Sequence, residues 1–331
     1  MKQIYGIDLS KEKFNVSIID LKGFLQDMEV NNNYSGICKF LAKIQKDAIL
    51  CIEHTGIYGD LLVFLANCFN ISICAIPGYE IKHSLGMQKG KSDPIDASNI
   101  REYGQRFSDK LKETVFYTEQ LHELRELHSL RYMLVKQRKM LQTHGKEKNR
   151  APYCSIKVKL VSQEVLRTLD KQIREVENQI QEVINADQEL AENSRLIQSI
   201  KGIGAVTANE LIIKTHNFEK INTARKASSF AGVCPFPNSS GKMAKKSRVS
   251  PMSDKKLKTL LFLCASSAIQ HNKDMKHYYE RKIAEGKPRY LALNNVANKI
   301  LRTVYAIIES RKMWDPLHIC LDPREGEKKA A

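Results

Sequence analysis

The fold of the first hundred residues is decided by the stretch Ile4-Tyr5-Gly6-Ile7-Asp8-Leu9-Ser10. It is an apolar run that ends in an acid, and apolar and polar side chains alternate in residues 14–18 after it. A continuous apolar run is typical of a buried strand, and alternation is typical of a strand with one buried face. The stretch therefore predicts a β-strand with Asp8 near its carboxyl end.

A second apolar run, residues 48–52, also ends in an acid, Glu53. The pattern predicts further strands at residues 3–7, 14–19, 25–30 and 71–76, and helices at residues 35–45, at residues 58–69 and from Pro94 onward. The order β-β-β-α-β-α-β, closed by a helix, is that of a ribonuclease H-like α/β sheet. In that architecture the first and fourth strands are neighbours, so we expect Asp8 beside Glu53 with the helix of Asp96 docked across them.

Two more acids lie in the segment Lys91-Ser92-Asp93-Pro94-Ile95-Asp96-Ala97. Pro94 fits the first turn of a helix, and Asp93 is then the residue just before that helix. Because Asp93 and Asp96 are three residues apart, their side chains face the same way. An N-cap residue with its third-position partner gives the same pattern, so this pair has a purely structural interpretation as well.

Together the four acids have the composition of a metal site. Carboxylates that are grouped without cations raise one another's pKa, which makes such a cluster costly. Mg²⁺ or Mn²⁺ neutralises carboxylates of this kind and binds phosphate oxygens. We therefore expect Asp8, Glu53, Asp93 and Asp96 to hold Mg²⁺ or Mn²⁺, as one ion or two, in a metal-dependent nuclease centre.

The composition indicates a soluble protein with a polyanionic partner. The chain has 331 residues, enough for two or three domains, and a formal net charge of +16 with a pI near 9.4. No apolar stretch is long enough to cross a bilayer and no leader precedes Ile4, so we expect a cytoplasmic, nucleoid-associated protein without a membrane contact. The eight cysteines form no close pairs, which indicates neither a zinc site nor a disulfide framework.

Residues 118–193 read as long, charged helices interrupted near residues 145–154. Apolar residues form one stripe before the interruption, at Leu121, Leu124, Leu127, Leu130 and Leu134. After it they form a heptad seam, at Leu166, Leu169, Ile173, Val176, Ile180 and Val183. The pattern predicts an antiparallel helical hairpin that packs on itself or on another protomer.

The first arm and the tip of this hairpin are basic. A charge run on a helix is usually a solvated face, but the basic excess of the whole chain favours nucleic-acid contact here. We expect such contacts from Arg131, Lys136, Arg138, Lys139, Lys146, Lys148 and Arg150, and from Lys89 and Lys91 ahead of the last two acids.

Residues 196–215 predict an apolar helix that runs into Gly202-Ile203-Gly204, after which another helix opens at once. This pattern is typical of a helix-hairpin-helix, in which glycines let backbone N–H groups approach a phosphate. An ordinary turn between helices gives the same pattern. We expect Gly202 and Gly204 to approach nucleic acid.

A loop over residues 233–242 breaks every periodicity and contains Ser239-Ser240-Gly241. Such a segment is usually only a flexible turn, but a serine in a basic loop can also attack a bound phosphate. Apolar helices at residues 255–271 and 290–311 are expected to core a second domain, followed by a polar tail. Basic residues that would bind phosphates near the serines are Lys242, Lys245, Lys246 and Arg248.

In combination and order, these motifs resemble one known family. The acids in Gly6-Ile7-Asp8, in Glu53-His54-Thr55-Gly56-Ile57-Tyr58 and in residues 91–97 look like the Asp-Glu-Asp-Asp set of the DEDD insertion-sequence recombinases related to the Piv DNA invertases. The C-terminal transposase domain of that family is similar to the segments Gly202-Ile203-Gly204, Phe230-Ala231-Gly232, Ser239-Ser240-Gly241 and Arg248-Val249-Ser250. The resemblance spans most of the chain, from Gly6 to about Arg311.

The resemblance implies a RuvC-like domain over residues 1–112, a coiled-coil hairpin over 113–193, a mainly α transposase domain over 194–318 and a polar tail over 319–331. It implies that Ser240, or Ser239 beside it, attacks DNA to give a phosphoserine–DNA intermediate while the four acids hold Mg²⁺ against the same phosphate. It also implies donor and target DNA as substrates, a structured noncoding RNA as guide, and a homodimer or homotetramer whose protomers share each site.

Two other functions compete with this transposase interpretation. In a metal-only, RuvC-like, structure-specific endonuclease, activated water cuts the strand and Ser240 has no role, but the long C-terminal domain is then unexplained. In a non-catalytic nucleic-acid binder, the acids are caps and solvated strand ends, and four of them need separate explanations. Asp8→Asn separates the binder from both enzymes, because a binder keeps its affinity and has no other activity to lose.

Overall fold

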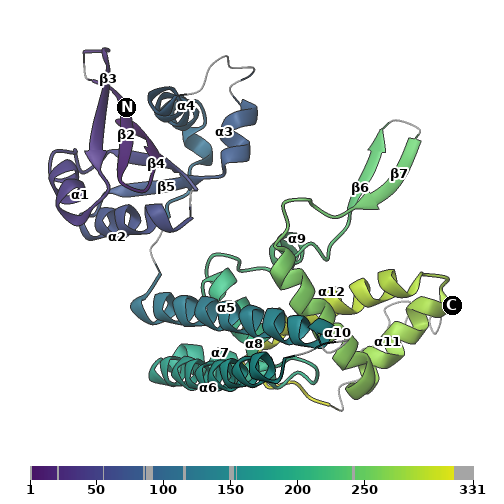
Figure 1. Ribbon diagram of the computed structural model, residues 1–331. Coiled ribbons are helices and arrows are strands. Elements are labelled where there is room, and N and C mark those ends of the chain that lie inside the picture. Colours follow the sequence, from purple (N-terminus) through teal and green to yellow (C-terminus); the bar gives the residue numbers. More distant parts are fainter. Residues whose placement is uncertain are drawn as a thin grey trace. The chain divides into compact units, whose positions relative to one another are not determined.

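The computed structural model describes residues 2–20, 22–54, 56–84, 86, 92–114, 117–148, 153, 155–240 and 243–316, with only the backbone described for residues 238–240 and 243–246. The chain forms two compact units, Met1–Phe116 and Tyr117–Ala331. Figure 1 shows a sheet with helices in the first unit and mainly helices in the second. The three-domain division expected from the sequence stays a prediction.

The sheet of the first unit has the strand order β3-β2-β1-β4-β5. Strand β1 pairs with β4 in parallel and with β2 antiparallel, as a ribonuclease H-like sheet requires. The mixed α/β architecture predicted from the sequence is therefore confirmed. Its strands are β1 (Ile4–Leu9), β2 (Lys13–Ile19), β3 (Leu25–Asn31), β4 (Ile49–Glu53) and β5 (Ser72–Ile76).

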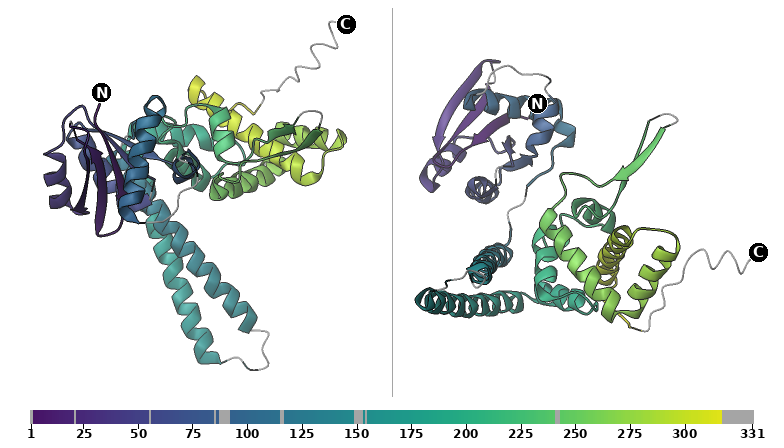
Figure 2. Two further views of the ribbon diagram at one scale, coloured as in Figure 1. Left: turned by 90° about the horizontal axis from the view of Figure 1, so that it is seen from above. Right: turned by 45° about the vertical axis from the view of Figure 1, so that its right-hand side comes forward.

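Helices cover both faces of this sheet (Figures 1 and 2). One face buries Ile7 and Leu50 against α1 and α2, while the other buries Ile4 and Cys51 against α3 and α4. Because side chains alternate along a strand, Asp8 and Glu53 point to the same face as Ile4 and Cys51. The helices are α1 (Tyr34–Leu41), α2 (Asp60–Cys68), α3 (Gly78–Ser84) and α4 (Asp93–Arg106), with 3₁₀ turns at Gly56–Gly59 and Ser108–Lys110.

Two helices differ from the sequence prediction. The first helix ends at Leu41 rather than near residue 45, and Asn33 caps its start by accepting from the Gly36 N–H. Helix α3 was not predicted, because Pro77 and the glycine after it indicate a turn. The structure continues from that turn into a short helix whose Ile81 is buried in the core.

In the second unit, two long helices lie side by side and extend from a helical body (Figure 2). Buried residues from both parts form one continuous core. The helices are α5 (Glu119–Lys148), α6 (Ile156–Ala186), α7 (Gln188–Gln198), α8 (Ala205–Thr215), α9 (Ala224–Phe230), α10 (Lys255–His271), α11 (Lys273–Ala284) and α12 (Arg289–Ser310).

The apolar pattern of α5 and α6 is buried only in part. Four seam residues of α6 are buried, namely Ile173, Val176, Ile180 and Val183. On α5 the predicted stripe is wrong at Leu130, which is 40% exposed, whereas His128 is only 4% exposed. The buried stripe of a helix drifts from a strict leucine pattern, and here a histidine takes the buried position.

Half of the segment that was predicted to be a loop, residues 236–240, forms a strand of a β-hairpin. Strands β6 (Phe236–Ser240) and β7 (Met243–Arg248) pair antiparallel, and Ser240 pairs with Met243. The prediction of an irregular loop is wrong for residues 236–240, because polar and basic residues hide the alternation that marks a strand.

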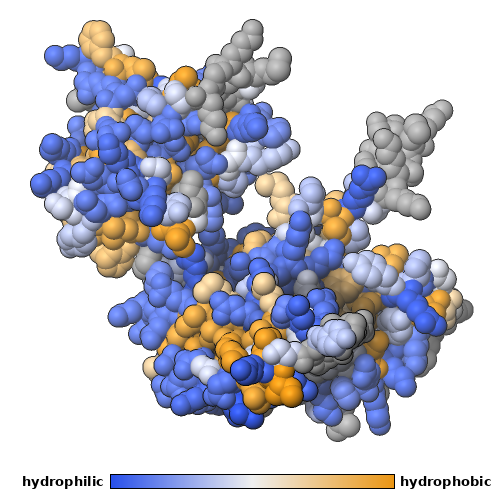
Figure 3. All heavy atoms as spheres, in the orientation of Figure 1, coloured by the Kyte–Doolittle hydropathy of each residue, from blue (hydrophilic) through white to orange (hydrophobic). Residues whose placement is uncertain are grey.

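No helix among the described residues is long and apolar enough to span a bilayer. Hydrophilic side chains dominate the visible face of each unit (Figure 3). Hydrophobic side chains gather instead over the part of α5 and α6 away from the helical body, where α6 exposes Val158, Leu160, Val161 and Val165.

Candidate active site and nucleic-acid interface

Asp8 and Glu53 stand at the carboxyl ends of neighbouring parallel strands. Ile7 of β1 is in register with Ile52 of β4, so the next residue on each strand is an acid at the same level of the sheet. Both side chains leave the sheet on the α3 and α4 side, as the alternation of buried residues shows. The adjacency predicted from the two apolar runs is thus present in the fold.

Helix α4 is pressed directly onto β1 beside these acids. A Cβ on Gly6 would lie 2.1 Å from the carbonyl oxygen of Ala97, so only glycine allows this approach. Helix α4 therefore contacts β1 at Ala97, the residue after Asp96. The contact on β1 is Gly6, two residues before Asp8. The predicted docking of the Asp96 helix across β1 is confirmed.

Asp93 begins α4 and does not precede it. Ser92 is the N-cap residue, Asp93 is the first helical residue and Pro94 follows in the first turn. The N–H of Asp96 bonds to the carbonyl oxygen of Ser92. The interpretation of Asp93 as the N-cap is therefore replaced by one in which both acids belong to the first turn.

Glu53 lies over the start of α3. A Cβ on Gly78 would be 2.0 Å from Oε1 of Glu53, so the absence of a side chain at residue 78 makes room for the carboxylate. Helix α3 is tied to α4 by the Tyr103 hydroxyl, which donates to Oε2 of Glu80 at 2.7 Å. Burial, followed by this hydrogen bond, raises the pKa of Tyr103 to about 12, so the donor stays protonated at neutral pH.

Asn32 links the two segments that follow the strands of Asp8 and Glu53. Nδ2 of Asn32 donates to the carbonyl oxygens of Ser10 at 2.8 Å and of Tyr58 at 3.0 Å. Ser10 follows β1, and Tyr58 lies in the turn that follows Glu53. The two segments that carry Asp8 and Glu53 are thereby held together beyond their strands.

The four acids suit a hard divalent cation in donor chemistry, since carboxylate oxygens are the ligands that Mg²⁺ and Mn²⁺ prefer. The fold places Asp8 and Glu53 at neighbouring strand ends, and α4, whose first turn carries Asp93 and Asp96, packs on β1. Within the described part of the chain, however, no three acidic, histidine or cysteine side chains lie close enough to enclose one ion. The ligand set of Asp8, Glu53, Asp93 and Asp96 stays a prediction.

The serines expected to act on DNA are the last two residues of β6. Ser239 pairs with Ala244 of β7 and Ser240 with Met243. Their side chains, those of Lys245 and Lys246, and all of Lys242 lie outside the described residues. Arg248, at the base of β7, is exposed.

The glycines between α7 and α8 have different surroundings. Gly202 has a φ of +108°, and a Cβ there would lie 2.8 Å from that of Ala268, so its conformation and packing both explain the glycine. Gly204 is the exposed N-cap residue of α8, and a Cβ there would meet open space. A phosphate contact at this helix N-terminus stays a prediction.

Two of the basic residues on α5 have a structural partner. Arg131 pairs with Glu177 at 2.7 Å, and Nε of Arg138 donates to Asp170 at 2.5 Å, both across to α6. These ion pairs join the two long helices, which accounts for the arginines without nucleic acid. Lys136, Lys139, Lys146 and Lys148 are exposed, while Lys89, Lys91 and Arg150 lie outside the described residues.

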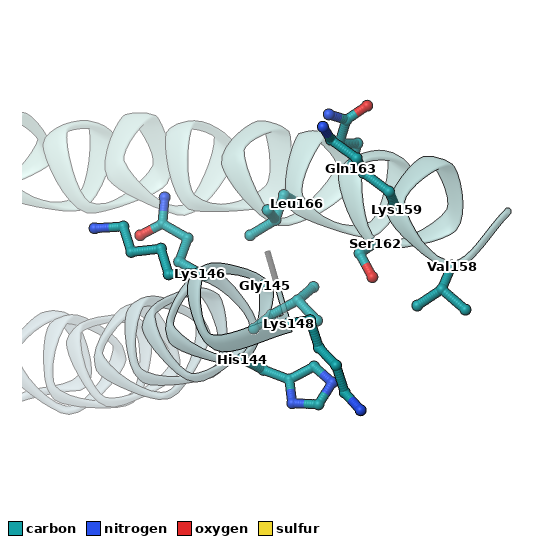
Figure 4. Close-up of a pocket in the computed structure, with 11 residues that line it drawn as sticks. His144, Gly145, Lys146, Lys148, Val158, Lys159, Ser162, Gln163 and Leu166 are labelled. Atoms are coloured by element: carbon teal, nitrogen blue, oxygen red, sulfur yellow. The ribbon is translucent and has the colours of Figure 1, made fainter. Parts of the chain in front are cut away.

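A basic pocket of about 260 Å³ opens between the far ends of α5 and α6 (Figure 4). Lys146 and Lys148 come from α5 and Lys159 from α6, and the lining that the structure describes contains no carboxylate. Among the described residues, no carboxylate pairs with these three lysines. The side chains of these three lysines point in different directions from the lining of the hollow (Figure 4), and a basic lining of this kind favours a phosphate-bearing polyanion. His144, Ser162 and Gln163 add further hydrogen-bonding groups.

A buried cluster of polar groups around Glu210 was not predicted from the sequence. Nε2 of His128 lies 2.8 Å from Oε2 of Glu210, and the ammonium group of Lys256 lies 2.7 Å from the same oxygen. It joins α5, α8 and α10, and the signal that could have revealed it is the single acid in the apolar run Ala208–Ile213. Burial raises the pKa of Glu210, but the two hydrogen-bonding partners outweigh burial and leave it below its usual value.

Comparisons with known proteins identify the chain's relatives. Residues 5–148 match a family model described as a transposase, and residues 194–280 match the model of the Transposase IS116/IS110/IS902 family. The pilin gene-inverting proteins of Moraxella bovis and Moraxella lacunata are each 25% identical to the chain, over 95% of it and 98% of their own length. A 43.6 kDa protein of insertion element IS110 from Streptomyces coelicolor is 25% identical over 37% of the chain and 30% of its own length.

The two family models match parts of both units, and the acid-bearing sheet lies within the first of them. The resemblance noted from the motifs is thereby confirmed. The chain is thus similar in both units to insertion-sequence transposases of the IS116/IS110/IS902 kind, which are enzymes that act on DNA.

Proposed function

We propose that this protein is the transposase of an insertion sequence, a site-specific recombinase that cuts and rejoins donor and target DNA. The observation that carries the proposal is the placement of Asp8 and Glu53 on adjacent parallel strands, with the first turn of α4 docked on the same strand. A DNA-cutting centre needs carboxylates at one edge of one rigid element, and this fold provides that edge.

The first unit is the metal-dependent half of the site in this proposal. Asp8, Glu53, Asp93 and Asp96 would hold Mg²⁺ or Mn²⁺. The bound ion would neutralise the carboxylates and stabilise charge on the phosphate. The protein's own contribution is rigidity, because Gly6, Gly78 and the Asn32 bridge fix the segments that carry the acids.

The β6–β7 hairpin supplies the nucleophile. The Ser240 hydroxyl attacks a DNA phosphate, an Oγ–P bond forms as the bond from phosphorus to a deoxyribose oxygen breaks, and the hydroxyl proton passes overall to that leaving oxygen. The reverse reaction with a second DNA end joins the new strand and releases the serine. Ser239 is the alternative nucleophile one residue away.

Two kinds of partner complete the proposal. A structured RNA would guide target choice, in agreement with a net charge of +16 and the basic pocket between α5 and α6. A second copy of the chain would cover the exposed apolar residues of α6, such as Leu160 and Val161, at 60% and 66% exposure. Dimers or tetramers would then combine the acids of one protomer with the serine of another.

Covalent trapping tests the mechanism. Purified protein, Mg²⁺, RNA from the element's flank and labelled DNA across the element junction are incubated, denatured in detergent and separated by mass. We expect a labelled adduct with the unaltered protein and with Ser239→Ala, and none with Ser240→Ala or Asp8→Asn. If Ser240→Ala still cuts DNA and no variant forms an adduct, the protein is instead a metal-only, RuvC-like endonuclease.

A further inference from the structure

The short helix α3 exposes an aromatic pair beside Glu53. The rings of Tyr79 and His83 stack with their centroids 3.9 Å apart and their planes 26° from parallel. Nδ1 of His83 lies 2.8 Å from the Tyr79 carbonyl oxygen, which holds the imidazole in place. Tyr79 is nevertheless 55% exposed, and Lys82, which lies between the two residues in the sequence, is exposed as well.

The inner side of α3 is firmly anchored. Ile81 is buried, and the Glu80 carboxylate accepts the hydrogen bond from Tyr103 of α4. Gly78, the residue before Tyr79, lies against the Glu53 carboxylate. The aromatic pair is therefore presented outward from a fixed helix, next in sequence to a contact with one of the four acids.

We propose that Tyr79 and His83 form a stacking platform for an unpaired DNA base next to the phosphate that is cut, and that Lys82 contacts the strand's backbone. This inference rests on the proposed function and deepens it by naming residues that position the substrate. Stacking accepts any base, because every base has a π-face, and an adjacent cation adds an attraction for phosphate.

A simpler interpretation is that two rings four residues apart only stabilise the helix that carries them. That interpretation predicts a change in stability when Tyr79 is replaced and no change in contact with DNA. The platform predicts direct contact between a base and Tyr79 or His83. A measurement of contact therefore separates the two interpretations.

Photocrosslinking measures that contact. The full-length protein is mixed with a single-stranded oligodeoxynucleotide that carries 5-iododeoxyuridine, irradiated, digested and analysed by mass spectrometry. We expect crosslinked peptides with the base attached to Tyr79 or His83. Crosslinks that map only to other aromatic residues would overturn the platform. The assay needs no cleavage, so its result is independent of whether Ser240 forms an adduct.

Variants make the test quantitative. Tyr79→Ala is expected to abolish the crosslink on α3 and to weaken binding of the same oligonucleotide about tenfold, whereas Tyr79→Phe keeps both. Phe24→Ala is the matched control, because Phe24 is 67% exposed in the β2–β3 turn at the opposite edge of the sheet. Equal binding by Tyr79→Ala and Phe24→Ala would contradict the proposal. Adduct formation without any effect of Tyr79→Ala would leave the recombinase intact and remove only the platform.

Discussion

Glu210 of α8 and His128 of α5 meet in the core of the second unit, with Oε2 and Nε2 2.8 Å apart and both side chains almost fully buried. Lys256 of α10 shares the same carboxylate oxygen. Six residues separate the end of β7 from the start of α10, so this cluster fixes the helix that follows the serine hairpin to the first long helix.

Removing the Glu210 carboxylate should destabilise the protein. Glu210→Ala leaves the buried His128 imidazole and the Lys256 ammonium group without the acceptor that they share, and a buried donor left unsatisfied costs about 1–3 kcal/mol, or more where the group is charged. Urea denaturation of the variant checks this value. Glu192→Ala is the control, since Glu192 is exposed and its ion pair with Arg311 is long, at 3.8 Å. An equal loss of unfolding free energy in both variants would contradict a special role for Glu210.

The same carboxylate should make stability sensitive to acid. Because the pKa of Glu210 is below 4.5 in the folded protein, the ionised group stabilises the fold above about pH 4.5, and this contribution is lost as the pH falls through the lower folded value. Glu210→Gln is expected to flatten the dependence below pH 4.5. An unchanged acid profile would show that other carboxylates are responsible.

His216 should act over a higher pH range. Burial, together with the charges of Lys220 and Arg125, lowers the pKa of His216 to about 4, and its ring stacks on Tyr117. As the pH falls below 6.5, His216 takes up a proton in the unfolded chain but stays neutral in the folded chain until about pH 4. The free energy of unfolding therefore falls between pH 6.5 and pH 4, by about 2 kcal/mol after allowance for solvent screening.

The control for His216 follows from its backbone. With a φ of 50° it lies in the left-handed region, which asparagine also tolerates. His216→Asn should therefore remove the fall in stability between pH 6.5 and pH 4 while the folded structure persists. Thermal unfolding across this range measures the difference, and parallel profiles for the two proteins would refute the assignment.

Two cysteines on the sheet should resist alkylation. Burial raises the pKa of Cys51 to about 12 and that of Cys74 to about 11, so their reactive thiolate forms are scarce at pH 8. Cys68 at the end of α2 is exposed. Iodoacetamide should label Cys68 in the native protein and reach Cys51 and Cys74 only after denaturation, as peptide mass spectrometry can show.

The basic pocket should control the salt dependence of binding. Replacing Lys146, Lys148 and Lys159 by glutamine removes up to three phosphate contacts and should reduce the slope of log K against log salt by about two to three. The same replacements at Lys39, Lys43 and Lys46, exposed near α1, remove equal charge from a different surface. Equal slopes for both triple variants would show a general charge effect and no pocket.

The sheet was predictable because its signals are local. Apolar runs that end in Asp8 and Glu53 mark two strand ends, and the strand order then makes them neighbours. Hairpin β6–β7 and the buried position of His128 were not predictable in this way. Their causes are non-local, since the hairpin depends on pairing between polar segments and His128 on the approach of Glu210, which lies 82 residues later in the sequence.

Two glycines, Gly6 and Gly104, allow α4 to pack closely on the sheet. Gly6 faces the backbone of α4 from β1, and Gly104 of α4 faces Cys51 of β4, where a Cβ would lie 2.6 Å from Sγ. Neither residue has a group that could do chemistry. Both should nonetheless reject every replacement as strictly as the acids do, so intolerance alone would not distinguish the residues that act on DNA from those that only bring a helix close.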